Sequence, residues 1–207
     1  MSLLDIIREM TSLRDQGIKK IAEIGVGRID VAFGALYWHN ETDGIPDYEI
    51  MMFEPHPLYH RMLDEAGGYK PNVELYNVAI GDEEGEMQLV DAATSSHLQG
   101  ISSPISQKNK KDELTGDVYT VKVEKISKYD KGDIDYLRVD TEGNEWFALK
   151  HLISRPKMIV VETHNNEATY INPYLFEIQK WAAENNYQCV SIQEGDHVFV
   201  KEENTAA

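Results

Sequence analysis

Short apolar segments alternate with segments of helical periodicity along most of the chain, and this alternation restricts the fold more than any other feature. Buried strands are predicted at residues 20–24, 49–53, 73–80, 134–139 and 158–161. Apolar residues at helical spacing predict helices at residues 29–38, 55–66, 144–153 and 173–186. Strands that alternate with helices form a mostly parallel sheet with helices on both faces. The chain is therefore predicted to be an α/β protein of the Rossmann-like type.

The C-terminal part of the sequence predicts a departure from a purely parallel sheet. Residues 188–192 and 197–201 are strand-like, and the turn between them is too short for a parallel connection. We therefore expect a seven-stranded, mostly parallel sheet with an antiparallel C-terminal hairpin strand. An ordinary dinucleotide-binding domain does not need such a hairpin.

The length of 207 residues suits one domain with its own core. We assign residues 1–201 to this domain, which begins with an N-terminal helix at residues 1–17, and residues 202–207 to a tail. The alternation is interrupted between two strand-like segments by a polar loop at residues 91–116. A loop this long in a compact domain is either a lid over a site or a flexible insertion.

The formal net charge of −16 argues against nucleic acid as a partner, because phosphate backbones are bound by clustered Lys and Arg side chains. The apolar runs are far too short to cross a membrane. Asp5, Glu9 and Asp15 interrupt the first apolar segment, which does not fit a secretion signal. We therefore expect a cytoplasmic protein that binds neutral or cationic small molecules.

The single cysteine, Cys189, excludes an internal disulfide and a zinc cluster built from thiolates. Because Cys189 lies in an apolar strand-like segment, we expect a buried structural thiol rather than a nucleophile. The candidates for chemistry are therefore the acidic and histidine side chains.

Glycines and polar residues follow the predicted strands directly, at the edge where open α/β sheets bind their ligands. Gly25 and Gly27 follow the first strand and allow a tight turn with close approach of a ligand to the backbone. Asp30 stands where a dinucleotide-binding turn has its third glycine, and its charge opposes a pyrophosphate. A cationic sulfonium amino acid fits better, with Glu23 available to its ammonium group. The alternative is a glycine turn capped by a helix, without a ligand.

The second and third strands also end in candidate binding residues. The carboxylate of Glu54 can accept hydrogen bonds from both hydroxyls of a ribose, which NAD and S-adenosylmethionine both carry. The alternative role for Glu54 is a helix cap before Pro55. Asn77 and the backbone of Ala79 are candidates for the adenine edge, and a plain strand followed by an acidic turn is the alternative.

Four ionisable side chains follow the next two strands. Asp140 and Glu142 come after the fourth strand, and Glu162 and His164 end the fifth. Because the carboxyl ends of parallel strands share one edge of a sheet, we expect the four groups to converge. Such crowding shifts pKa values and makes a general base plausible. Each group taken alone has a structural alternative, as a helix cap or a member of a salt bridge.

Taken together, these segments resemble the FkbM family of methyltransferases. The resemblance runs from about Ile21 to Glu162, and it is carried by Phe53-Glu54-Pro55, by residues 77–82 and above all by residues 134–143 followed by a helix. It implies a class I methyltransferase fold, the version of the Rossmann-like fold that ends in an antiparallel hairpin. It also implies S-adenosylmethionine as the cofactor and methylation of a hydroxyl on a sugar, a glycan or a secondary metabolite.

The resemblance carries over to individual residues. Glu54 matches the ribose-binding acid of the family, and Asp140 with Glu142 matches the acidic pair near the transferred methyl group. Ser95-Ser96 resembles the paired serines of the family's mid-chain loop, and Ser102-Ser103 is a rival match.

The first glycine loop departs from the family pattern. This chain has Glu23 where the family has an Asp, and Ile29 where the family has a later Gly. The departure concerns the binding of the methionine end of the cofactor and not the fold.

Methyl transfer requires an aligned acceptor oxygen and a group that takes the hydroxyl proton. Asp140 or His164 is the expected base, with Glu142 orienting or binding the substrate. Histidine titrates near neutrality, which favours His164, although a structural role at the rim is its alternative. The same three side chains are an alternative ligand set for a magnesium, manganese or zinc ion, but we predict no metal.

Two other classes of function stay open at this point. One is an NAD- or nucleotide-sugar-dependent Rossmann enzyme, against which the missing third glycine and the terminal hairpin count. The other is a module that binds S-adenosylmethionine or a nucleotide without turnover, against which the clustered acids and histidine count. We expect a small-molecule or glycan substrate with a hydroxyl, while the acceptor itself and the oligomeric state are not predicted.

Overall fold

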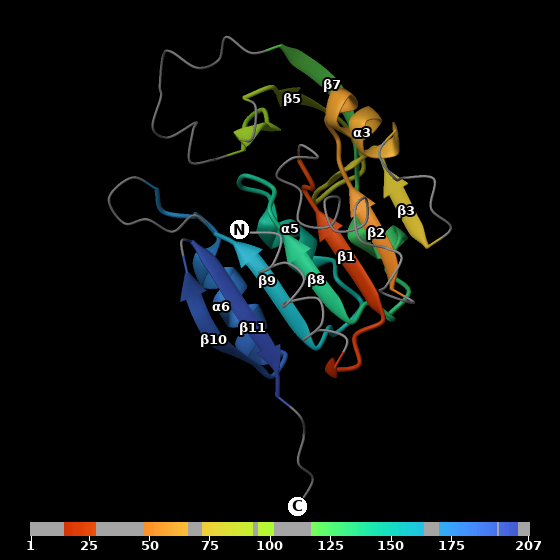
Figure 1. The fold of residues 1–207 in the computed structure, drawn as a ribbon. Helices are drawn as coiled ribbons and strands as arrows, with labels where there is room; N and C mark the ends of the chain where they lie inside the picture. The colour runs from red at the N-terminus through yellow and green to blue at the C-terminus, as the bar shows by residue number, and fades with distance from the viewer. Residues whose placement is uncertain are drawn as a thin grey trace, which may run out of the picture.

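The computed structural model describes residues 15–27, 48–65, 72–92, 95–101, 117–163, 170–193 and 195–202. Within these ranges the main sheet has seven strands in the order β10-β11-β9-β8-β1-β2-β3 (Figure 1). Their bounds are β1 Lys20–Ile24, β2 Glu49–Phe53, β3 Val73–Tyr76, β8 Tyr136–Val139, β9 Met158–Glu162, β10 Tyr187–Gln193 and β11 Asp196–Lys201. Only β11 runs against its neighbours, β10 and β9. The predicted α/β class, with a mostly parallel sheet and an antiparallel C-terminal hairpin strand, is confirmed.

The central strands end at the same level, which brings their following residues together. Ile24 at the end of β1 lies opposite Phe53 of β2 and Val139 of β8. One residue earlier, Glu23 of β1 is the neighbour of Arg138. Polar residues at these positions therefore meet at one edge of the sheet.

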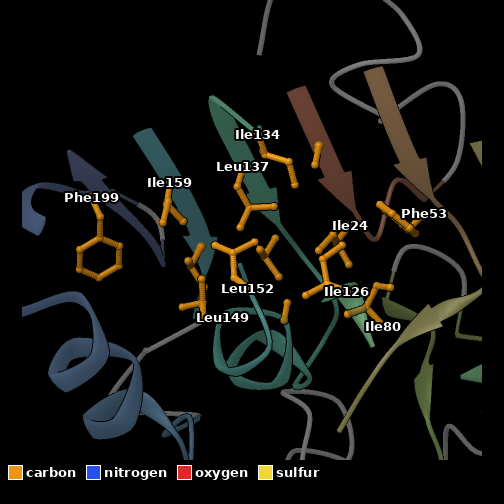
Figure 2. Close-up of a cluster of buried hydrophobic side chains, with 14 of the residues drawn as sticks. Ile24, Phe53, Ile80, Ile126, Ile134, Leu137, Leu149, Leu152, Ile159 and Phe199 are labelled. Atoms are coloured by element: carbon orange, nitrogen blue, oxygen red, sulfur yellow. The ribbon is translucent and has the colours of Figure 1, made fainter. Parts of the chain in front are cut away.

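Helices α5 (Glu145–Lys150) and α6 (Leu175–Glu184) cover one face of the main sheet. Figure 2 shows the apolar side chains between these helices and the strands, among them Leu137, Leu149 and Ile159. Alternate strand residues form a second cluster on the opposite face, to which α3 (Pro57–Leu63) contributes Leu63. Burial on both faces explains why these strands are continuous apolar runs in the sequence.

A second, four-stranded sheet lies at the carboxyl ends of the main strands (Figure 1). Its order is β4-β7-β5-β6, with β4 at Ala79–Ile80, β5 at Gly85–Val90, β6 at His97–Leu98 and β7 at Val118–Glu124. The single strand expected at residues 73–80 is therefore wrong, because its last two residues pair with β7 in the second sheet. The break follows from Asn77, whose side-chain amide donates to the carbonyl oxygens of Glu54 (2.8 Å) and Pro55 (3.1 Å) and so turns the chain away from β2.

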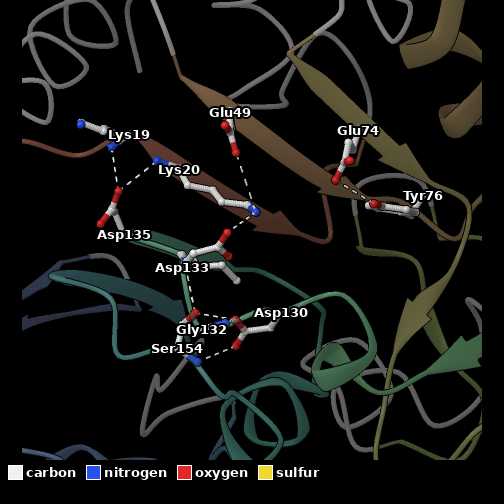
Figure 3. Close-up of polar contacts among 11 residues, drawn as sticks. Lys19, Lys20, Glu49, Glu74, Tyr76, Asp130, Gly132, Asp133, Asp135 and Ser154 are labelled. Atoms are coloured by element: carbon white, nitrogen blue, oxygen red, sulfur yellow. Dashed lines mark hydrogen bonds and ion pairs between the residues drawn. The ribbon is translucent and has the colours of Figure 1, made fainter.

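Polar contacts at the amino ends of the strands also fix the register of β1 with its neighbours (Figure 3). The Asp135 carboxylate accepts hydrogen bonds from the backbone amides of Lys19 (2.9 Å) and Lys20 (3.1 Å). The Lys20 ammonium lies 2.9 Å from Asp133 and 3.9 Å from Glu49. These contacts join β1 to both of its neighbours at the end of the sheet opposite the candidate site.

Several sequence predictions fall on residues outside the described ranges. They are the helix at 29–38, most of the N-terminal helix and of the 91–116 loop, Ser102-Ser103 and His164. Within the described ranges, no helix has the length and apolar composition needed to cross a bilayer. The expected burial of Cys189 is wrong, because Cys189 lies on the edge strand β10 beside a register shift and is exposed.

Candidate active site

A cavity of about 460 Å³ opens at the carboxyl ends of the main strands, between them and the second sheet. Its volume lies within the range of roughly 300 to 1,000 Å³ that is typical of small-molecule sites. Its lining includes most of the residues singled out in the sequence, namely Glu23, Gly25, Gly27, Glu54, Ala79, Asp140 and Glu142. Asn77 is not part of the lining. The edge of the sheet predicted to bind a ligand therefore carries a cavity of suitable size.

Gly25 makes the turn after β1 close against the end of β8. Its φ of +80° is in the left-handed region, and a Cβ at this position would lie 1.7 Å from the carbonyl oxygen of Asp140. Its amide donates to the Phe53 carbonyl at 3.0 Å, and the Asp140 amide donates to the Ile24 carbonyl at 2.9 Å. Only glycine fits here, since any side chain would displace the backbone that carries Asp140.

Glu54 joins the glycine turn to the end of β2. One carboxylate oxygen accepts from the Gly27 amide at 2.6 Å, and the other accepts from the His56 amide at 2.7 Å. Burial raises the pKa of Glu54 to about 7, with the two amide bonds opposing the rise and the charges of Asp140 and Glu23 adding to it. The carboxylate is thus held in a fixed orientation on the cavity wall and titrates near neutrality.

Arg138 lies among the acidic side chains of the cavity and was not assigned a role from the sequence. Its guanidinium is 3.5 Å from the Asp140 carboxylate. Burial alone would lower the pKa of Arg138, but the carboxylates of Glu23 and Asp140 outweigh this effect and raise it. Burial, together with a hydrogen bond to Asp140, raises the pKa of Glu162 well above the usual range for a carboxyl. Asp140 is therefore flanked by a cation and a protonated acid.

Glu142 occupies a tight position between Asp140 and the second sheet. Its backbone has a φ of +56°, which is uncommon for a residue with a side chain. Burial raises the pKa of Glu142 to about 8, the charges of Asp140 and Glu145 add to the rise, and a hydrogen bond with the Ser95 side chain opposes it. Glu142 is thus largely protonated at neutral pH.

The loop that carries Asp140 and Glu142 is held by Glu145, the first residue of α5. One oxygen of its buried carboxylate accepts from the Gly143 amide at 2.7 Å and from the Thr141 amide and hydroxyl at 3.3 and 3.1 Å. The other accepts from the Asn172 side chain at 3.2 Å. A charged acceptor that binds several donors in one loop restricts the loop to one conformation.

The second sheet and α3 supply cavity residues that the sequence analysis missed. His97 and Leu98 of β6 line the cavity, as does Tyr59 of α3, whose ring stacks on His56 with a centroid distance of 4.0 Å. Asn144 also lines it, and the Oδ1 atom of Asn144 is buried without a hydrogen-bond partner in the described part of the chain. Proximity to Ser95-Ser96 was the one signal in the sequence that pointed to His97.

Three of the four ionisable groups that follow the fourth and fifth predicted strands gather at the cavity. Asp140, Glu142 and Glu162 all line the cavity. His164 lies outside the described residues. Within the described ranges, no group of three or more His, Cys, Asp or Glu side chains is arranged to hold a metal ion.

Comparison with known proteins agrees with this geometry. The family model of the methyltransferase FkbM domain matches residues 22–189. A search of proteins with curated functions found no match. Among solved structures, a methyltransferase FkbM from Methylobacillus flagellatus superposes with a TM-score of 0.50 at 12% identity, covering 88% of this chain and 43% of the other. This chain therefore spans less than half the length of that protein.

Two further solved structures have the same fold over nearly the whole chain. A putative caffeoyl-CoA O-methyltransferase from Staphylococcus aureus gives a TM-score of 0.50 at 10% identity and covers 98% of this chain and 85% of its own. The SAH-bound methyltransferase PaMTH1 from Podospora anserina gives 0.50 at 13% identity, with coverages of 98% and 80%. At such low identities these likenesses concern the fold alone.

Proposed function

Since the family model covers residues 22–189, the chain belongs to the FkbM methyltransferase family, and from this premise we propose that it transfers the methyl group of S-adenosylmethionine to a hydroxyl oxygen of a sugar, a glycan or a secondary metabolite. The observation that supports the proposal best is the convergence of Glu23, Glu54 and Asp140 on one cavity from three different strands. An adenosyl sulfonium cofactor needs a ribose acceptor and negative charge near its cationic groups, and these three carboxyl groups offer both.

The cofactor fits the donors and acceptors that are present. Glu54 is the proposed ribose acid, because a carboxylate has about four acceptor sites and the Gly27 and His56 amides use two of them. Glu23 is the proposed partner of the ammonium group. The turn at Gly25 and Gly27 allows close approach of the methionine end to the backbone. When bound, S-adenosylmethionine supplies an electrophilic methyl group on a positively charged sulfur.

Asn77 and Ala79 have different proposed roles near the adenine. Ala79 lines the cavity and is available to the base through its backbone. The Asn77 amide is engaged by the Glu54 and Pro55 carbonyls, so we assign it the role of positioning the ribose acid. The Oδ1 atom of Asn144, which has no hydrogen-bond partner among the described residues, is a further acceptor at the cavity wall.

The acidic pair is proposed to act on the acceptor side. Asp140 carries a negative charge close to where the sulfonium would lie, and Glu142 in its protonated form donates a hydrogen bond to the acceptor or receives one from it. Asp140 and His164 remain the proton acceptors suggested by the sequence. A divalent ion held by Asp140, Glu142 and His164 remains the alternative way to activate the hydroxyl.

Cofactor identity is tested by calorimetric titration of the chain with S-adenosylhomocysteine (SAH), NAD and a nucleotide sugar. We expect micromolar binding of SAH and no binding of the other two. Binding of NAD alone would support the dinucleotide-dependent alternative instead.

Turnover is tested by a methyl-transfer screen with S-adenosylmethionine and a panel of methyl glycosides and phenols, including caffeic acid. The proposal expects transfer to at least one hydroxyl, and Asp140→Asn should lower that rate strongly while leaving SAH affinity nearly unchanged. SAH binding without transfer to any hydroxylated compound would favour the non-catalytic binding module.

A further inference from the structure

His97 belongs to the second sheet and lines the same cavity as the glycine turn after β1. It is the first residue of β6, pairs with Val90 of β5, and has only 4% of its surface exposed. The same cavity is lined by Glu54 and Asp140. A buried histidine therefore lines the cavity proposed to bind the cofactor and acceptor, on a segment that the sequence analysis treated as a loop.

The hydrogen bonding of His97 assigns its tautomer. Its Nδ1 atom lies 3.1 Å from the carbonyl oxygen of Ser95. A carbonyl oxygen only accepts, so Nδ1 carries the hydrogen and donates it. In the neutral ring Nε2 is then a bare acceptor, and among the residues that the structure describes none forms a hydrogen bond with it. The ring is thus held in the tautomer that can take up a proton at Nε2.

Ser95 connects this imidazole to the acidic side of the cavity. Its backbone carbonyl accepts from His97, and its side chain forms a hydrogen bond with Glu142. The bond to Ser95 also fixes the ring plane, as the orienting group of a catalytic base does.

The acidic side chains are less suited to take the proton. Asp140 already accepts a hydrogen bond from Glu162 and lies 3.5 Å from the Arg138 guanidinium, so its charge is stabilised by two partners. Glu142 and Glu162 hold their own protons at neutral pH, because burial and neighbouring charges raise their pKa values. Asp140 is therefore already engaged by two neighbours, and the other two acids are protonated.

We propose that His97 is the general base of the transfer reaction, an inference that rests on the proposed methyltransferase function. As the acceptor oxygen forms its bond to the methyl carbon, its O–H bond breaks and the proton moves to Nε2 of His97. The electron pair of the broken carbon–sulfur bond stays on the sulfur, which becomes a neutral thioether. The imidazolium then releases its proton to solvent, and the ring returns to its starting tautomer. Asp140 contributes negative charge and does not change its protonation.

The first test needs no acceptor. Side-chain ¹H–¹⁵N correlation spectra of the uniformly labelled chain at pH 8, with SAH bound, report which ring nitrogen of each histidine carries hydrogen. The His97 signals are identified by their loss in His97→Gln. We expect a protonated Nδ1 and a bare Nε2. A His97 ring that carries hydrogen on Nε2 under these conditions overturns the proposal.

The second test measures methyl transfer to the methyl glycoside or phenol that the wild type methylates fastest. His97→Gln should lower kcat by about 100-fold or more, with KM and SAH affinity changed less than threefold, because a general base contributes roughly 10²- to 10⁴-fold. Added imidazole should restore part of the activity of His97→Ala. The matched control is His60→Gln, since His60 lies on α3 outside the cavity.

The results separate this inference from the proposed function. A His97→Gln variant that keeps kcat within threefold of the wild type, while Asp140→Asn or His164→Gln loses it, assigns the base elsewhere and overturns the role of His97. A wild-type chain that does not bind SAH contradicts the methyltransferase function itself. A wild type that binds SAH but has the wrong His97 tautomer contradicts only the present inference.

Discussion

Glu54 accepts a hydrogen bond from the backbone amide of Gly27 at 2.6 Å, which joins the turn after β1 to the end of β2. The two residues are 27 positions apart in the sequence, and each belongs to a motif that would be weak evidence alone. Their contact makes the glycine turn and the acid one structural unit. A change in the acid should therefore affect both cofactor binding and the conformation of the turn.

Glu54→Gln tests this unit. A glutamine has one acceptor oxygen, so it can serve the Gly27 amide or the His56 amide but not both, and it has no charge for the ribose hydroxyls. We expect SAH affinity to fall roughly 10- to 100-fold, since a hydrogen bond to a charged group contributes about 1.5 to 3 kcal/mol. Calorimetric titration measures the change. Glu49→Gln at the exposed start of the same strand is the control, and equal affinities for the two variants would contradict the prediction.

Gly25→Ala should lower the free energy of unfolding far more than the addition of one methyl group suggests. The new Cβ would lie 1.7 Å from the Asp140 carbonyl oxygen, in addition to the strain of a positive φ. Gly100 has a similar φ of +86° but no heavy atom within 4 Å of the Cβ position. Gly100→Ala therefore measures the cost of a positive φ alone, without a close contact. We expect a loss of about 1 to 2 kcal/mol in the free energy of unfolding for Gly100→Ala and a loss greater than about 3 kcal/mol for Gly25→Ala. Urea unfolding of both variants measures the difference, and similar losses would show that the close contact is easily relieved.

The buried carboxyls predict how stability depends on pH. Burial raises the pKa of Glu54 to about 7 and of Glu142 to about 8, whereas both are near 4.5 in the unfolded chain. Between these values the folded chain keeps protons that the unfolded chain has released, so a rise in pH favours unfolding. Their contribution is fully present below pH 4.5 and is lost as pH rises through 7 and 8. Each pKa unit corresponds to about 1.4 kcal/mol, so the free energy of unfolding without cofactor should fall by several kcal/mol, on the order of 3 for Glu54 and 5 for Glu142.

Thermal unfolding from pH 5 to pH 9 measures this dependence. Glu142→Gln should flatten the upper part of the curve, because the amide does not titrate. Glu124 does not interfere in this window: burial alone would raise its pKa, but hydrogen bonds from Lys122, Lys128 and Tyr129 lower it to about 2. A wild-type melting temperature that stays constant or rises from pH 5 to pH 9 would show that the two carboxyls are not protonated in the folded chain.

The main sheet was predictable because its strands are buried on both faces and appear as continuous apolar runs. The residues after β1, β2 and β8 were predictable as cavity residues for a related reason, since parallel strands bring their carboxyl ends to one edge. Glu54 and Asp140 therefore followed from strand order and residue type alone, before any contact between them was known.

The second sheet was not predictable in the same way. Residues 73–80 have one continuous strand pattern, and the break after Tyr76 depends on Asn77 bonding to Glu54 and Pro55, which are distant in sequence. His97 was missed because β6 is two residues long and, in the part of the chain that the structure describes, lies at the edge of the second sheet beside β5. Cys189 was expected inside because its segment is apolar, but β10 is an edge strand, and Val190 and Ile192 beside it are exposed as well.

Glu145 offers the last test, because it holds the loop that carries the acidic pair. Glu145→Gln keeps an oxygen for Thr141 and Gly143 but turns an NH₂ group toward the Asn172 amide, whose own oxygen already accepts from Tyr174 at 2.9 Å. Two donors then face each other, at a cost of about 1 to 3 kcal/mol in the free energy of unfolding. Glu145→Ala leaves the Thr141 and Gly143 donors without this acceptor, whereas the Asn172 amide keeps the Thr163 carbonyl at 3.3 Å, and it should cost about 3 to 5 kcal/mol. Urea unfolding ranks the variants, with the exposed Glu184→Gln of α6 as a control that should change little. If Glu145→Ala is as stable as Glu184→Gln, the loop does not depend on this carboxylate, and the orientation of Asp140 and Glu142 must be maintained by other contacts.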